Sequence, residues 1–138
     1  SFRRRILERE PFDERLPLYS EMEDTDMGTR IRRHGEVGYS FAALAVHLKT
    51  GSGRINYRMH GFSQIMNAFY LARKGSIPKS EAYVNIILRK VFQNAVLCLI
   101  PGRRTGRWEL LKGNCIALSH ILRGRVEPEL ITHLKQRG

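Results

Sequence analysis

Apolar spacing predicts one helix in the first part of the chain, and helix-ending residues predict a second. Within residues 24–34, Met27 and Ile31 stand four positions apart, which predicts a helix with one apolar face. Residues 56–73 predict a longer helix, because a glycine and a proline follow it within five residues and are the usual signals that end one.

Residues 80–100 predict a third helix with a single apolar stripe. Its members follow helical spacing: Val84, Ile87, Leu88, Val91, Ala95 and Leu99. Polar side chains occupy the other face, so two interpretations of the stripe stay open. It packs on a core, or it docks on a membrane interface. A last amphipathic helix is predicted over residues 109–122.

Strand-forming residues concentrate between the first two helices. Valine, tyrosine and phenylalanine within residues 37–46 favour one or two short strands. Glycines in residues 51–53 predict a loop after them, and residues 1–10 predict a short strand or the start of a helix.

Four carboxylates crowd into six positions at the start of the first predicted helix: Glu21, Glu23, Asp24 and Asp26. One interpretation is structural, because Asp24, Thr25 or Asp26 is suited to cap the helix and a solvated acidic N-terminus suits its dipole. The other is chemical. Repulsion between close carboxylates raises the pKa of at least one of them, which is what a general base requires.

Charge is distributed unevenly along this basic chain of net charge +11. Residues 1–36 hold eight Lys/Arg against nine Asp/Glu, whereas residues 37–138 hold sixteen against four, a net +12. Such a surface attracts anionic partners, which include nucleotide diphosphates, lipid phosphates, acidic membranes and nucleic acids. The two cysteines lack metal-ligand spacing and predict buried thiols in a reducing compartment.

Five segments together resemble the family 2 glycosyltransferases. They are residues 12–16 (FDERL), 23–27 (EDTDM), 30–35 (RIRRHG), 45–47 (AVH) and 67–74 (NAFYLARK). Their order and spacing are similar to the second half of a GT-A domain, well over residues 1–75 and weakly beyond.

The resemblance implies an α+β fold. Residues 1–75 would be the acceptor-side, catalytic half of a GT-A domain, and residues 76–138 a helical C-terminal extension. The Rossmann-like nucleotide-binding half would precede residue 1, so the isolated chain would be an inactive fragment.

The activity implied is inverting transfer of a hexose or deoxyhexose from a nucleotide-sugar to a carbohydrate or lipid-linked acceptor, as in cell-envelope polysaccharide synthesis. Asp24 matches the family's catalytic base, which removes the proton of the acceptor hydroxyl. Glu23 and Asp26 would bind the acceptor. The letters D-x-D at residues 24–26 lie inside this helix block and are not interpreted as the metal site.

The donor side of the reaction needs a positively charged partner for the leaving diphosphate. By the resemblance, His47 would bind Mg²⁺ or Mn²⁺ at the end of the predicted strand. Lys49 and Arg54 flank the glycines of the following loop and would bind the diphosphate.

A module without catalysis is the alternative, binding nucleic acid or docking on an anionic membrane surface through the basic part of the chain. Against nucleic acid, aromatic residues are not interleaved with the basic ones, and the acidic cluster would repel phosphates. The expected location is cytoplasmic, with peripheral attachment at the inner face of the membrane through the basic half.

Overall fold

The structure, a computed structural model, describes residues 4–18, 21–36, 38, 41–42, 46, 56–100 and 104–136. Every regular element in these ranges is a helix, and no strand occurs in them. The expectation of an α+β half of a GT-A domain is therefore wrong. Of the predicted strand region 37–46, the described residues 38, 41–42 and 46 are not in a strand, and the others lie outside the described part.

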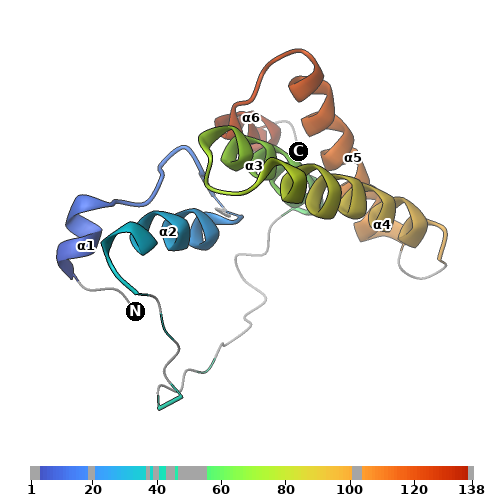
Figure 1. Ribbon diagram of the computed structural model, residues 1–138. Coiled ribbons are helices and arrows are strands. Elements are labelled where there is room, and N and C mark those ends of the chain that lie inside the picture. The colour runs from blue at the N-terminus through green and yellow to red at the C-terminus, as the bar shows by residue number, and fades with distance from the viewer. Residues whose placement is uncertain are drawn as a thin grey trace.

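A helical bundle forms the larger part of the molecule (Figure 1). Its elements are α3 (Tyr57–Lys74), the π-helical η2 (Glu81–Leu88), α4 (Arg89–Cys98), α5 (Arg104–Leu122), the 3₁₀-helix η3 (Pro128–Leu130) and α6 (Ile131–Gln136). α3 packs against α5, η2 and α6, and its apolar side chains fill the core. The fully buried core members include Phe62, Ile65, Met66, Ala117 and Ile131.

Local signals set both ends of α3. The Asn56 side chain accepts a hydrogen bond of 2.9 Å from the Arg58 backbone N–H, as an N-cap residue does. Gly75 has a φ of 85° and donates its N–H to the Leu71 carbonyl, so the chain leaves the helix through the left-handed conformation. The predicted helix 56–73 is thereby confirmed to within one residue at each end.

Two glycines let α3 and α5 meet at backbone distance. A Cβ on Gly61 would overlap the Leu110 carbonyl, and a Cβ on Gly113 would overlap the Arg58 carbonyl. Beside this crossing, the buried Asn114 donates from Nδ2 to the Gly61 carbonyl over 2.7 Å. Its Oδ1 accepts from Asn94 Nδ2 at 2.8 Å, which ties α4 to the same contact. At this crossing the helices are closely packed, and the buried asparagine side chains have hydrogen-bond partners.

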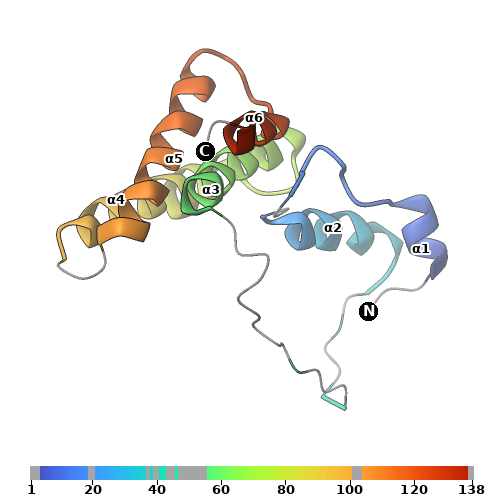
Figure 2. The same ribbon diagram turned by 180° about the vertical axis from the view of Figure 1, so that it is seen from behind.

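Three short helices lie to one side of the bundle (Figures 1 and 2): α1 (Arg4–Arg9), α2 (Glu23–Ile31) and the 3₁₀-helix η1 (Arg32–His34). α2 and η1 together confirm the predicted helix 24–34. A second apolar cluster joins the loop before α2 to the end of α3 and the start of the next helix, and it consists of Leu16, Leu71, Ala72, Ile77 and Ala82. The loop 10–18 is thus anchored on α3.

The apolar stripe predicted over residues 80–100 is only partly correct. Ile87 is buried, but Leu88 and Leu99 are 63% and 78% exposed. Val91 packs on the core four residues after Ile87, so these two members share one helical face, whereas Val84, Leu88 and Leu99 are exposed. The fully buried positions in α4 are Asn94 and Cys98.

Candidate functional site

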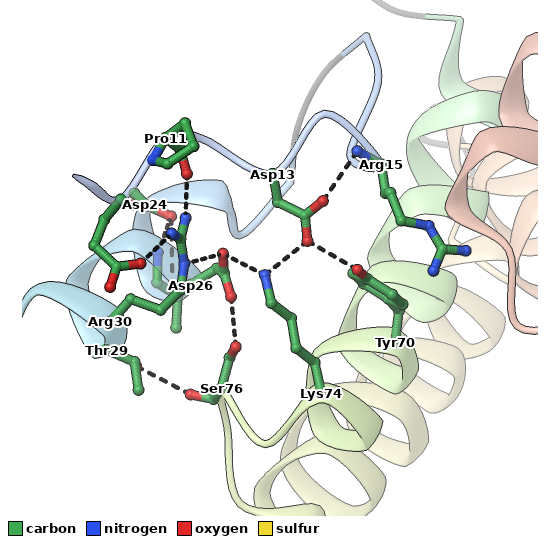
Figure 3. A network of polar contacts seen from close by, with 12 residues as sticks. Pro11, Asp13, Arg15, Asp24, Asp26, Thr29, Arg30, Tyr70, Lys74 and Ser76 are labelled. Carbon is green, nitrogen blue, oxygen red and sulfur yellow. Dashed lines mark hydrogen bonds and ion pairs between the residues drawn. The ribbon is translucent and has the colours of Figure 1, made fainter. Parts of the chain in front are cut away.

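Asp26 is the buried centre of a polar network between α2 and the end of α3 (Figure 3). Its carboxylate is 1% exposed. Oδ2 accepts hydrogen bonds from Arg30 Nε at 3.0 Å and Lys74 Nζ at 2.9 Å, and Oδ1 accepts one from the Ser76 hydroxyl. Thr29 adds a bond of 3.0 Å from its hydroxyl to the Ser76 carbonyl. These bonds fix α2 against the turn that follows α3.

The network lowers the pKa of Asp26, against the expected direction for a crowded carboxylate. Burial alone would raise this pKa, but the hydrogen bonds from Ser76 and Lys74 and the charges of Lys74 and Arg30 outweigh it. For this member of the acidic cluster, the Ser76 hydroxyl and the two cationic partners lower the pKa. Asp26 is ionised near neutral pH and already engaged by protein groups.

Asp13 forms the second half of the network. Its Oδ2 accepts from Lys74 Nζ at 2.7 Å and from the Tyr70 hydroxyl at 2.8 Å, and its Oδ1 accepts from the Arg15 backbone N–H at 3.0 Å. Lys74 therefore bridges Asp13 and Asp26. Burial alone would lower the pKa of Lys74, but hydrogen bonds to both carboxylates raise it, so the bridge stays charged.

Arg30 extends the network to the segment after α1. Its Nη1 lies 2.8 Å from Glu10 Oε2, and its Nη2 donates to the Pro11 carbonyl at 2.8 Å. His34 Nε2 lies 3.0 Å from the other Glu10 oxygen. Hydrogen bonds with His34 and Arg30 lower the pKa of Glu10. One arginine thus joins α2 to the loop that carries Asp13.

The other members of the acidic cluster differ in their partners. Glu21 Oε2 lies 3.2 Å from His60 Nδ1 on α3. Within the described part of the chain, neither Glu23 nor Asp24 forms an ion pair. The side chain of Asp24 is exposed to solvent, and that of Glu23 is half-buried. Asp24 Oδ1 accepts the Thr25 backbone N–H at 2.8 Å. Asp24 is therefore held at the start of α2 with Oδ2 without a described partner.

Among the described residues no side chain caps α2, and Asp24, Thr25 and Asp26 all lie inside the helix, so the capping expectation for them is wrong. The N-cap residue is Met22, with a φ of 70°, and the acidic residues lie in the first turn. The position of these acidic residues in the first turn suits the helix dipole.

An open cleft of about 420 Å³ adjoins the network. Three cationic side chains, those of Arg15, Arg73 and Lys74, line it together with Tyr70. Arg15 lies 5.0 Å from the centroid of the Tyr70 ring and pairs with Glu129. A cleft of this size is within the range of small-ligand sites. The predicted site included neither Asp13 nor these residues, although residues 12–16 and 67–74 carried the resemblance.

The proposed donor-side residues His47, Lys49 and Arg54 lie outside the described residues. Among the described residues, no group of three or more His, Cys, Asp and Glu side chains is arranged to hold a metal ion. The two cysteines differ, because Cys98 is buried as expected and Cys115 is exposed.

No family model, curated protein or solved structure matches the chain. In the described part of the chain, none of the helices has the length and apolar character needed to cross a membrane.

Proposed function

We propose that this chain carries the general base of an inverting glycosyltransferase, and that Asp24 is this base. The observation that carries the proposal is that two aspartates of one helical turn have different surroundings. Asp26 is buried with its charge engaged by Arg30 and Lys74, while Asp24 is exposed and forms no ion pair among the described residues. The resemblance of residues 23–27 to the glycosyltransferase block supports the same residue.

The reaction proposed is a single displacement at the anomeric carbon of a nucleotide-sugar. As the acceptor oxygen forms its bond to that carbon, Asp24 Oδ2 takes the hydroxyl proton. The bond to the nucleoside diphosphate breaks, and its electron pair leaves on the phosphate oxygen. The acceptor would be a carbohydrate or a lipid-linked sugar. A divalent cation, with His47 as its ligand and Lys49 and Arg54 beside it, would supply charge for the leaving group.

Asp26 is proposed as a positioning residue in this scheme, not as an acceptor ligand. Both of its oxygens accept bonds from protein groups, and 1% of the side chain is exposed. Its role is to hold the first turn of α2, and with it Asp24, at a fixed place. Glu23 is half-buried next to Asp24 and remains the candidate for binding acceptor hydroxyls.

Sugar transfer by the full-length protein that contains this chain tests the proposal, with UDP- and dTDP-sugars as donors. Asp24→Asn keeps the shape of the side chain and most of its hydrogen bonding but cannot accept a proton at neutral pH. Turnover is expected to fall by about 10²–10⁴-fold, the usual contribution of a general base.

Glu23→Gln is the matched control, because it removes the neighbouring charge from the same helical turn. It is expected to change the KM for the acceptor more than turnover. Full activity of Asp24→Asn together with loss of activity in Glu23→Gln would assign the base to the other carboxylate.

A further inference from the structure

One face of the helix formed by η2 and α4 is apolar and unpacked. Its exposed side chains are Val84 (58%), Leu88 (63%), Phe92 (72%), Val96 (42%) and Leu99 (78%). From Leu88 onward they are spaced by four, four and three residues, which places them on one side of an α-helix. Asn94 and Cys98 are the residues of α4 that are buried in the bundle. The exposed stripe is therefore a second apolar face, distinct from the one that packs.

Large aliphatic and aromatic side chains gathered in this way indicate a binding surface. Scattered single apolar residues are normal on protein surfaces, but a continuous row along a helix is not. α4 runs along an outer side of the bundle in both ribbon views (Figures 1 and 2), with its side away from α3 and α5 uncovered by other described elements. The row is accessible over the whole of α4.

The charges that follow Glu81 in the sequence of this helix and its continuation are all basic. Between Glu81 and Glu109 the chain contains five Lys/Arg and no Asp/Glu. Two of the five, Arg89 and Lys90, belong to α4 itself, and Arg89 follows directly on Leu88 in the exposed arc. Beyond Glu81, in the first turn of η2, this helix combines exposed apolar side chains with charges that are all basic, which is the character of helices that lie in a membrane interface.

We propose that this apolar face, Val84 to Leu99, docks on an anionic membrane surface. The apolar side chains enter the boundary between headgroups and acyl chains, and the basic residues pair with lipid phosphates. Charge argues against a second copy of the chain as the occupant. A two-fold interface brings each patch against itself, so the same positive charges would meet across it.

The basic residues do not all serve docking. Arg107 Nη1 donates to Asn94 Oδ1 over 3.2 Å, and Asn94 is buried beside Asn114. Replacing Arg107 would therefore disturb the packing of α4 on α5 and confuse a binding assay. Arg89 and Lys90 have no described hydrogen bond or ion pair and are the residues to change.

Co-sedimentation with vesicles tests the proposal on the 138-residue chain. Vesicles of phosphatidylcholine with about 30% phosphatidylglycerol, whose headgroups give the surface a negative potential, are compared with pure phosphatidylcholine. The doubly substituted Phe92→Ser/Leu99→Ser protein should bind the anionic vesicles at least about tenfold more weakly, since two apolar side chains no longer enter the interface. Leu122→Ser is the matched control, because Leu122 is 86% exposed at the end of α5, outside this face. It should bind as the unchanged chain does.

A second variant separates charge from apolar contact. Arg89→Gln/Lys90→Gln should weaken binding to anionic vesicles several-fold, should leave the weak binding to neutral vesicles unchanged, and should reduce the loss of binding as salt is added. Circular dichroism is the control for folding, and each variant should keep the helical signal of the unchanged chain.

Three results would overturn the proposal. The first is equal vesicle binding by the Phe92→Ser/Leu99→Ser variant and the unchanged chain. The second is the absence of any preference for anionic vesicles. The third is a dimer of the unchanged chain that this variant converts to monomer while no vesicle binding occurs, because a second copy would then be the occupant.

Discussion

At the scale of single residues, replacing Asp26 should destabilise the fold strongly. It is the shared acceptor of Arg30, Lys74 and Ser76 and is almost completely buried. Asp26→Asn removes one carboxylate partner from both Arg30 and Lys74. The Asn amide has a single oxygen, so it cannot accept hydrogen bonds at both positions where Asp26 does. We expect the free energy of unfolding to fall by about 3 kcal/mol, the size found when a buried ion pair loses one partner. Urea unfolding measures it, and a loss below about 1 kcal/mol would mean that the network behaves like a surface ion pair.

The pH dependence of stability should follow the same residues. The pKa values of Asp13 and Asp26 are lowered in the folded chain from an ordinary value of 3.8. For a carboxylate with a lowered folded pKa, the stabilisation is complete above the unfolded pKa and is lost as the pH falls through the folded one. Stability should therefore decline below about pH 4 and continue to decline toward the folded pKa values. In Asp26→Asn this acid decline should be shallower, and an unchanged slope would contradict the assignment.

The sequence predicted the acidic cluster but not which of its carboxylates is buried and paired with cationic side chains. Their crowding is visible along the chain, whereas the partners that distinguish Asp26 from Asp24 are Lys74 and Ser76, which follow 48 and 50 residues later. Nothing in local spacing indicates which carboxylate meets a lysine from another helix. The rise in pKa expected for at least one member of the cluster does not fall on Asp26, whose pKa is lowered for this reason.

At the scale of elements, the glycine contact between α3 and α5 determines how closely the bundle packs. Gly113→Ala would place a Cβ against the Arg58 carbonyl and the Phe62 backbone nitrogen. The helices must separate, and we expect a loss of about 1–3 kcal/mol, as in other overpacked cores. Gly28→Ala in α2 is the control, because a Cβ there meets nothing within 4 Å. It should stabilise by about 0.5–1 kcal/mol through helix propensity, and thermal unfolding of the two variants should shift in opposite directions.

Helices with strong local signals were predictable, and the others were not. The glycine and proline that follow α3 predicted its C-terminal end, and the predicted start at residue 56 is the residue that caps the helix in the structure. The stripe over residues 80–100 was only partly correct, because Ile87 and Val91 pack on the core whereas Val84, Leu88 and Leu99 are exposed. Apolar residues lie on more than one face of this helix, and spacing alone does not say which face packs on the bundle.

At the scale of the whole molecule, the structure replaces the expected sheet with a helical bundle and an attached helical segment. The α+β expectation followed from the resemblance and from strand-forming residues in 37–46, most of which lie outside the described residues. What joins the two parts is a set of long-range contacts: the Lys74 bridge, the Arg15–Glu129 pair and the apolar cluster around Leu71. Such contacts depend on the complete fold, so local sequence patterns do not predict them.

The most direct test of the account compares two substitutions two residues apart in one helical turn. We propose that Asp26 holds the first turn of α2 in place and that Asp24 accepts the proton of the acceptor hydroxyl. In the full-length protein, Asp24→Asn should lower turnover by about 10²–10⁴-fold with an unchanged melting temperature, and Asp26→Asn should lower the melting temperature markedly. Measured below that temperature, Asp26→Asn should retain much more activity than Asp24→Asn. Full turnover of Asp24→Asn would contradict the central claim, whatever the effect of the change at Asp26.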